Sequence, residues 1–339
     1  MKAIVQDRYG PPETLTLADV DRPVPGPGEV LVRVEAAALN AYDWHVMRGD
    51  PRMARLALGR SRPKARIRGR DFAGRVEAVG AGGGAAGGGG FRPGDAVFGD
   101  LGDDNGAFAE YVRVPEELVA PMPANLTPEQ AAALPLAGVT ALMGLCDAGE
   151  LQPGQHVLVN GASGGVGTLA VQLAKLLGAT VTAVCSTRNA DLVRSLGADH
   201  VVDYTRDDFT RLGPRHDLVL DLVGNRTLRA LRRSVTPTGT LVLSGGGVYR
   251  GGSVIGPVWL IARGRLLAPF LRRQRIVVLT TAPSRSHLDM LRTHAEKDGL
   301  VPVIDRSFEL HEVPEAIRYL ETEHARAKVV ISILPTHAE

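Results

Sequence analysis

The chain has 339 residues, which is more than one simple hydrophobic core organises and predicts two domains of ordinary size. Hydrophobic residues make up 44% and charged residues 22% of the chain, a composition typical of folded globular proteins and not of disordered chains. The net charge of +2 and the 4% of aromatic residues argue against a nucleic-acid-binding or membrane-binding protein.

Cysteine content and the N-terminus indicate where the protein works. Cys146 and Cys185 are the only cysteines, too few for a four-cysteine zinc site and without the pattern of a disulfide framework. The N-terminus lacks the apolar segment of a signal peptide. The most apolar stretch, Val254 to Leu271, is interrupted by Arg263 and Arg265, so no membrane span is expected. We therefore expect a protein of the reducing cytoplasm.

The first part of the chain, residues 1 to 124, is predicted to be rich in β-structure. Strands at Glu29 to Ala36 and Ala107 to Val114 alternate with proline and glycine turns. The stretch Gly80 to Gly90 has almost no side chains to bury and is predicted to be a flexible loop between two strands. A phosphate-binding role for it is disfavoured, because no helix begins after it.

From His156 the pattern changes to alternating strands and helices. The predicted strands are 156–160, 181–185, 201–202, 218–223, 240–243 and 276–280, and the clearest helices are 166–177 and 190–196. This alternation predicts an α/β domain with a doubly wound parallel sheet.

The last part of the chain resembles the first domain again. It is predicted to contain the strand 303–310, the helix 313–323 and the strand 329–333. The chain is therefore expected to return to its first domain. This predicts one domain formed by residues 1–124 and 302–339, and a second formed by residues 125–301.

A glycine-rich turn lies between the first strand and first helix of the second domain. Its residues are Ala162, Ser163, Gly164, Gly165, Val166 and Gly167. Between a strand and an amphipathic helix, this pattern predicts a dinucleotide site, with Gly164 against the pyrophosphate and Gly167 packing helix on strand. The helix N-terminus supplies N–H groups to the phosphates. Ala162 replaces the usual first glycine, which is acceptable if that position needs no positive φ. A purely structural turn is the alternative.

Cofactor preference is decided about 20 residues further on. An acidic residue there would bind the ribose 2′-hydroxyl of NAD, but this chain has Ser186-Thr187-Arg188. Hydroxyls and a guanidinium favour a 2′-phosphate, so NADPH is predicted. Arg188 could instead be an ordinary surface charge. Tyr204 could pack near the adenosine, or be a half-exposed aromatic at a strand end.

Seven motifs in order give the chain a family resemblance. They are Gly28 to Val32, Leu39 to His45, Gly69 to Gly74, Arg92 to Val97, Asn160 to Gly167, Leu196 to His200 and Lys328 to Val330. Together they resemble the medium-chain dehydrogenase/reductase superfamily, in its quinone-oxidoreductase-like branch. The resemblance implies a GroES-like catalytic domain beside a Rossmann domain, with the cofactor in the cleft between them.

The zinc ligands of related alcohol dehydrogenases are missing. By motif alignment, Asn40 stands where the first cysteine ligand would be, and Arg70 where the histidine would be. The segment 99–108 has no cysteine and is too short for a structural zinc lobe. We therefore expect no metal. Without a Lewis acid, acceptors that spread negative charge by conjugation are favoured, namely quinones, enones and enals.

The resemblance also implies roles for residues of both domains. Asn40 and Thr140 would lie near the nicotinamide, Ser244-Gly245 would line the cleft, and Lys328 would face the cofactor from the closing segment. After hydride delivery the product anion needs a proton, which Tyr42, His45 or solvent could supply. A structural role for Tyr42 is equally compatible with the sequence.

Two segments have open roles. Arg48 to Arg70 contains nine cations, which could attract an acidic substrate or form a solvated loop. Val254 to Phe270 is apolar with interspersed arginine and could cap the substrate pocket or join a subunit interface, with weak membrane association as a third interpretation.

Three functions fit these patterns. The leading hypothesis is an NADPH-dependent reductase of a quinone or a conjugated carbonyl compound. The second is a biosynthetic enoyl reductase on a dedicated substrate, and the third is a non-catalytic NADPH-binding protein. A homodimer is expected, because relatives commonly pair through an edge strand of the nucleotide-binding domain.

Overall fold

The structure, a computed structural model, describes most of the chain. It covers residues 1–81, 90–211, 213, 215–244, 258–268, 273–323 and 325–333. The chain divides into two compact units: unit 1 combines Met1–Val139 with Ala282–Glu339, and unit 2 is Thr140–Thr281.

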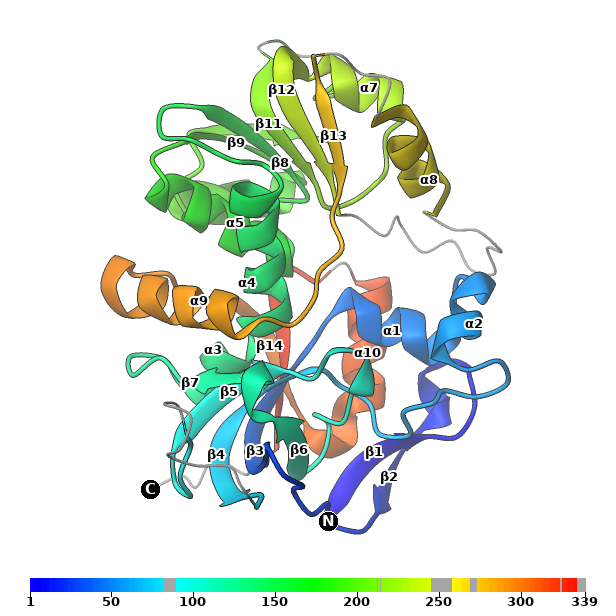
Figure 1. The fold of residues 1–339 in the computed structure, drawn as a ribbon. Coiled ribbons are helices and arrows are strands. Elements are labelled where there is room, and N and C mark those ends of the chain that lie inside the picture. Colours follow the sequence, from blue (N-terminus) through cyan, green and yellow to red (C-terminus); the bar gives the residue numbers. More distant parts are fainter. Residues whose placement is uncertain are drawn as a thin grey trace. The chain divides into compact units, whose positions relative to one another are not determined.

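Unit 1 is built around a mainly antiparallel sheet (Figure 1). In the described part of the chain the strand order is β14-β15-β3-β4-β5-β7, and β6 also pairs with β3. The strands are β3 (Glu29–Leu39), β4 (Asp71–Val79), β5 (Ala96–Asp100), β6 (Tyr111–Pro115), β7 (Val119–Pro121), β14 (Ile304–Glu309) and β15 (Lys328–Ser332). A separate pair is formed by β1 (Lys2–Gln6) and β2 (Leu15–Asp19).

The C-terminal segment completes this sheet. β15 pairs antiparallel with β3, and β14 pairs parallel with β15. The helix α10 (Val313–Thr322) between them buries Val313, Ala316 and Ile317, the spacing of one helix face. The predicted return of the chain to its first domain is confirmed.

Several helices cover or flank unit 1. They are α1 (Ala41–Arg48), α2 (Arg55–Leu58), α3 (Pro128–Ala132) and α9 (Arg285–Asp298), while α4 (Pro135–Leu142) runs across the unit boundary. α9 belongs here because it packs near β7 and because the Asn125 side chain donates a 2.8 Å hydrogen bond to the Ala295 carbonyl. The unit boundaries therefore differ from the predicted domain boundaries at 124 and 302.

Unit 2 contains a parallel sheet. Among the described residues its order is β10-β9-β8-β11-β12-β13. The strands are β8 (His156–Asn160), β9 (Thr180–Cys185), β10 (His200–Asp203), β11 (His216–Asp221), β12 (Val235–Leu243) and β13 (Arg275–Val278), and the helices are α5 (Gly165–Leu176), α6 (Ala190–Ser195), α7 (Leu228–Arg233) and α8 (Val258–Leu267). The predicted doubly wound parallel sheet is confirmed.

The strand order reverses at β8. The chain first adds β9 and β10 on one side of β8, then returns to add β11, β12 and β13 on the other. At such a switch point the loops after the two central strands separate, and the crevice between them is where ligands bind in this fold class. The glycine-rich turn follows β8 and so lies at this point.

Two predicted segments are only partly described. β4 and β5 pair antiparallel, so Gly80 to Gly90 does connect two strands, but its residues 82–89 lie outside the described part. The helix α8 forms the centre of the segment Val254 to Phe270, whose ends also lie outside it. Within the ranges given above, every helix is too short or too polar to cross a lipid bilayer.

Candidate functional site

The glycine-rich turn places a helix N-terminus at the switch point. Gly164 is the N-cap of α5, and within the described residues no side chain caps it. Ser163, Gly164, Gly165 and Val166 are partly exposed. Backbone N–H groups of the first turn of α5 are therefore open to an anionic ligand, and the aligned peptide dipoles favour negative charge there.

Three positions of the turn show why these residue types are needed. Gly161 has a φ of 89°, a conformation that favours glycine. A Cβ on Gly167 would lie 2.1 Å from the Gly161 carbonyl oxygen, so only glycine lets α5 pack this closely. Ala162 is buried and is not among the residues with positive φ, which satisfies the condition set for it. Gly161, which directly follows β8, was not among the turn residues predicted to bind the dinucleotide.

Asn189 connects the turn to the loop after β9. It is 4% exposed, and its Nδ2 donates to Ser163 Oγ at 3.0 Å and to Ser186 Oγ at 3.3 Å. One buried amide therefore orients two hydroxyls on two loops that would face the cofactor. Asn189 was not predicted as a site residue from the sequence, because it lies three residues after Ser186 without a motif of its own.

The loop after β9 presents the residues predicted to recognise the nucleotide. Ser186 is half-buried, and Thr187 and Arg188 are exposed. Thr187 Oγ1 donates a hydrogen bond to Asp203 Oδ2. Hydrogen bonds from Thr187 and Thr205 hold the pKa of Asp203 below its ordinary value. An ionised carboxylate therefore does reach this loop, from the end of β10 and not from β9.

Tyr204 lies beside the same loop. Its backbone N–H donates to the Cys185 carbonyl at 3.0 Å, which extends the pairing of β10 with β9 by one residue. Its side chain is among the exposed large hydrophobic groups, with 46% of the residue surface accessible. The ring is therefore free to contact a ligand, in agreement with the half-exposed aromatic considered from the sequence.

A buried carboxylate fixes the ends of the two central strands. Asp221 accepts a 2.8 Å hydrogen bond from Asn160 Nδ2 and two more from backbone N–H groups of the following loop. Burial raises the pKa of Asp221. Because Asp221 ends β11 and Asn160 ends β8, this pair holds together the two strands that border the switch point.

The remaining predicted cofactor residues of unit 2 lie at strand and helix ends. The Ser244 N–H donates to the Asp221 carbonyl at 2.9 Å; its neighbour Gly245 lies outside the described residues. Thr140 is 6% exposed, and its Oγ1 lies 3.2 Å from Thr281 Oγ1. Thr140 thus joins α4 to the segment after β13.

In unit 1, Asn40 is part of a buried polar cluster. Lys328 Nζ donates to Asn40 Oδ1 at 2.7 Å and lies 3.3 Å from Asp71 Oδ2. Asn40 Nδ2 donates to the same Asp71 oxygen at 2.9 Å, and the Leu136 N–H donates to the other at 3.1 Å. Burial raises the pKa of Asp71 to about 6, although the Lys328 ammonium acts to lower it. Lys328 therefore holds Asn40 and Asp71 in place.

Asn40 is also the N-cap of α1. Its N–H donates to Asp43 Oδ2 at 2.7 Å, which ties the first turn of the helix to the end of β3. Asp43 is 2% exposed, and among the described residues its Oδ1 has no hydrogen-bond partner. Burial raises the pKa of Asp43 to about 7, so this carboxyl is partly protonated near neutral pH.

Arg70 forms a buried ion pair with Asp100. It makes two hydrogen bonds to the Asp100 carboxylate, at 2.9 and 2.8 Å, and its guanidinium lies 4.7 Å from the centre of the Tyr42 ring. Arg70 and Asp100 are both buried. The guanidinium at the position of the zinc-binding histidine is thus committed to a bidentate ion pair.

The two candidate proton donors differ in their hydrogen bonds. The Tyr42 hydroxyl donates to Asp103 Oδ1 at 2.9 Å, and burial and this bond raise the pKa of the phenol to about 12. His45 Nδ1 lies 3.0 Å from the Asp50 carbonyl oxygen, which can only accept. Nδ1 therefore carries the proton and Nε2 of the neutral ring carries none. Burial also lowers the pKa of His45.

In the described ranges, no three histidine, cysteine, aspartate or glutamate side chains are placed together so that they could hold a metal. Cys185 is buried and Cys146 is half-buried, and both are free thiols. Burial raises the pKa of each thiol, to about 11 for Cys185.

Comparison with known proteins gives matches along the whole chain. Residues 26–124 match the alcohol dehydrogenase GroES-like domain, and residues 196–331 match a family described as zinc-binding dehydrogenase. A chloroplastic quinone oxidoreductase of Triphysaria versicolor is 33% identical over 98% of this chain and 98% of its own length.

Two further matches extend this result. A chloroplastic NADPH-dependent alkenal/one oxidoreductase of Arabidopsis thaliana is 32% identical over 99% of this chain and 80% of its own length. The solved structure of the quinone oxidoreductase from Coxiella burnetii has a TM-score of 0.81 and 30% identity, and the match covers 98% of this chain and 99% of that one. The chain therefore belongs to the medium-chain dehydrogenase/reductase superfamily, in its quinone-oxidoreductase-like branch.

Proposed function

We propose that this protein is an NADPH-dependent reductase that transfers hydride to a quinone or to the activated C=C bond of an enone or enal, without zinc. The observation that carries the proposal is the open N-terminus of α5 at the switch point, beside a loop with Ser186, Thr187 and Arg188. The names of the quinone and alkenal/one oxidoreductases described above support the same reaction.

The residues of unit 2 fit a bound dinucleotide. The first turn of α5 would hold the pyrophosphate, and Asn189 would keep the hydroxyls of Ser163 and Ser186 oriented. Thr187 and Arg188 would contact the 2′-phosphate, and Tyr204 the adenine face. The nicotinamide supplies the hydride when it is bound, and the protein determines its orientation and surroundings.

The donor set of unit 1 supports the choice of acceptor. Asn40 donates a hydrogen bond to Asp71 and accepts one from Lys328, and Arg70 donates to Asp100, so neither of these positions offers a zinc ligand. Without a metal to stabilise an alkoxide, hydride acceptors that delocalise the new charge are favoured. We propose Tyr42 as the proton donor to the resulting anion, and Asn40 and Lys328 as positioning residues.

Cofactor preference gives the first test. NADPH is expected to bind more tightly than NADH, and Arg188→Ala is expected to weaken NADPH roughly tenfold to over a hundredfold, the effect of losing about 1.5–3 kcal/mol of charge-assisted bonding. NADH affinity should change little. Fluorescence titration of both cofactors measures this, and Arg194→Ala, which removes an exposed cation paired with Asp191, is the control.

Asp203 provides a second variant for the same titration. Its carboxylate lies near the proposed 2′-phosphate position and repels it, so Asp203→Asn is expected to increase the preference for NADPH. Equal affinity of the wild-type protein for both cofactors would contradict the assignment. Turnover of a small quinone or enone with NADPH distinguishes an enzyme from a non-catalytic binder.

Zinc content gives an independent test. The purified protein is expected to contain less than stoichiometric zinc, and chelation should leave turnover unchanged, because an amide and a paired guanidinium occupy the family's ligand positions. Metal analysis and activity before and after chelator treatment measure this. Stoichiometric zinc whose removal abolishes turnover would overturn the zinc-free assignment while leaving the family membership intact.

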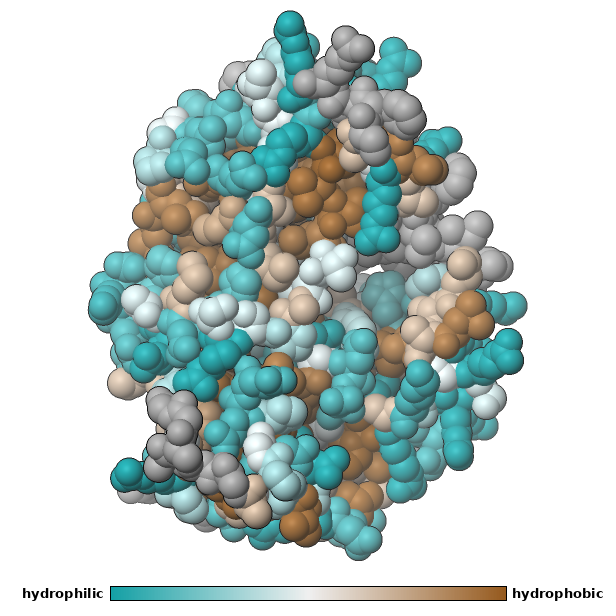
Figure 2. Space-filling model, viewed as in Figure 1, coloured by the Kyte–Doolittle hydropathy of each residue, from teal (hydrophilic) through white to brown (hydrophobic). Residues whose placement is uncertain are grey.

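We also propose a cytoplasmic homodimer that pairs through β13. Within the described residues β13 is the last strand of its sheet, and Val277, Val278 and Leu279 are only half-buried. Figure 2 shows hydrophobic residues at the surface where Figure 1 draws β13 and α8. An unpaired apolar edge favours symmetric pairing. Light scattering at micromolar concentration is expected to give the mass of two chains. The Val278→Lys variant should give a mass closer to that of one chain.

A further inference from the structure

The nine cations between Arg48 and Arg70 divide into groups with different environments. Three make salt bridges: Arg48 with Glu321, Arg66 with Asp7 and Arg70 with Asp100. Arg55 donates to two backbone carbonyls, and Arg52, Arg60, Arg62 and Lys64 are exposed. Arg68 differs from all of these, because it is buried and makes no salt bridge with any residue in the described part of the chain.

The Arg68 side chain is a buried cation without hydrogen bonds at two of its nitrogens. Arg68 is 2% exposed, and among the described residues its Nε and Nη1 have no hydrogen-bond partner. Its backbone is fixed on both sides, since its N–H donates to the Ile4 carbonyl and its carbonyl accepts from the Phe108 N–H. Burying a guanidinium with two such nitrogens is costly, so an anion that pairs with Arg68 would stabilise this arrangement.

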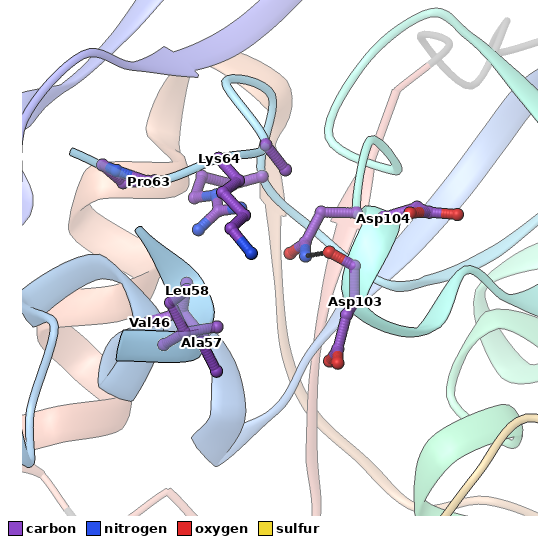
Figure 3. Close-up of a pocket in the computed structure, with 10 residues that line it drawn as sticks. Val46, Ala57, Leu58, Pro63, Lys64, Asp103 and Asp104 are labelled. Atoms are coloured by element: carbon purple, nitrogen blue, oxygen red, sulfur yellow. Dashed lines mark hydrogen bonds between the residues drawn. The ribbon is translucent and has the colours of Figure 1, made fainter. Parts of the chain in front are cut away.

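Arg68 lies in the wall of a pocket within unit 1. The pocket has a volume of about 410 Å³, within the range of small-molecule sites. Its lining residues are Val46, Ala57, Leu58, Pro63, Lys64, Ala65, Arg68, Asp103, Asp104 and Asn105. One side is therefore apolar, and Figure 3 shows Lys64 above Val46, Ala57 and Leu58, with Asp103 and Asp104 across the cavity.

The acidic groups near the pocket do not neutralise Arg68. Asp103 accepts the Tyr42 hydrogen bond and has an 84% exposed side chain. Asp104 is also exposed, and in Figure 3 its carboxylate is directed away from Lys64. Asp43 attracts Arg68 electrostatically, but no salt bridge joins them among the described residues. Asn105 adds a buried acceptor, because its Oδ1 has no partner among these residues.

We propose that this pocket binds a small carboxylate with an apolar body, and that the Arg68 guanidinium pairs with the carboxylate. The planar guanidinium matches the two oxygens of a carboxylate, and such charge-assisted pairs are strong when water is excluded. The apolar wall receives the body of the ligand. Asn105 Oδ1 would accept from a hydroxyl or N–H group on it, and Lys64 at the surface attracts the anion.

This proposal does not rest on the proposed reductase function, since the pocket residues all belong to unit 1. Binding can be measured without NADPH, so a failure of the pocket assignment and a failure of the reductase assignment give separate results. A conjugated acceptor with a carboxylate would be one ligand of the proposed class.

Calorimetric titration with benzoate tests the pocket, and benzamide serves as the neutral analogue of the same shape. The wild-type protein is expected to bind benzoate saturably and benzamide at least tenfold more weakly. Arg68→Leu should weaken benzoate at least tenfold, and Arg68→Lys should give an intermediate loss because it keeps the charge without the planar fork. Arg66→Leu is the matched control and should bind as the wild type.

The stability of the variants separates a ligand role from a structural one. Arg68→Leu removes a buried unpaired charge, so its melting temperature should equal or exceed that of the wild type. Benzoate should raise the melting temperature of the wild type and of Arg66→Leu by similar amounts. The rise should be smaller in Arg68→Leu and in Arg68→Lys. Equal binding of benzoate and benzamide, unchanged benzoate binding in Arg68→Leu, or no saturation up to roughly 10 mM would overturn the proposal. If Arg68→Leu fails to fold, the comparison of benzoate with benzamide and the saturation of benzoate binding, both measured on the wild-type protein, still test the proposal.

Discussion

Replacing Lys328 by methionine is expected to lower the free energy of unfolding by about 3–5 kcal/mol, the usual cost of leaving one member of a buried ion pair alone. Lys328 and Asp71 are 2% and 0% exposed, so water cannot replace the lost ammonium. Asn40 would also lose the partner of its Oδ1. Denaturant unfolding of the wild type and of Lys328→Met measures the difference.

The pH dependence identifies the cause. Because burial places the pKa of Asp71 at about 6, above its ordinary value, its protonation favours the folded state, and that stability is lost as the pH rises through about 6. The Lys328 ammonium lowers the pKa of Asp71. Its removal therefore raises this pKa and extends the loss of stability to higher pH. The destabilisation should therefore be larger at pH 8 than at pH 5.

A double-mutant cycle with Asp71→Asn serves as the control for this interpretation. The double variant leaves no unpaired charge, so its destabilisation should be smaller than the sum of the two single effects. A pH-independent and additive loss would show instead that Lys328 contributes through packing alone.

Tyr42→Phe is expected to lower turnover of an enone by roughly 10² to 10⁴, the usual contribution of general acid catalysis, with little change in NADPH affinity. The phenol keeps its proton up to a pKa of about 12, so the wild-type rate should show no loss from Tyr42 ionisation between pH 6 and 9. Single-turnover kinetics with NADPH measure the chemical step directly.

His45→Gln is the matched comparison. The hydrogen bond from His45 Nδ1 to the Asp50 carbonyl leaves Nε2 without a proton, so this variant should stay within a few-fold of the wild type. A large loss of turnover in His45→Gln alone would show that His45, and not Tyr42, is the proton donor. Near-wild-type rates in both variants would mean that solvent protonates the product, and that holding the nicotinamide against the acceptor provides most of the catalysis.

The sequence alone determined the features that depend on near neighbours along the chain. The alternation of apolar strand and helix segments along the chain predicted the parallel sheet. The spacing of glycines between β8 and α5 predicted the turn, because steric limits on φ and on close packing act within a few residues. The seven ordered motifs identified the family. The residues Ser186, Thr187 and Arg188 after β9 predicted a preference for NADPH, because their side chains follow directly from their position in the sequence.

Only the tertiary structure decided which charges meet. Lys328 and Asp71 are separated by 257 positions in the chain, and Asp203 reaches Thr187 only because β10 pairs beside β9. The nine cations of the segment Arg48 to Arg70 looked alike in sequence, yet Arg68 is buried, and two of its nitrogens have no hydrogen-bond partner among the described residues. Strand register and burial set these outcomes, and both depend on contacts between distant segments, because a charge becomes costly or useful only where folding has removed the surrounding water.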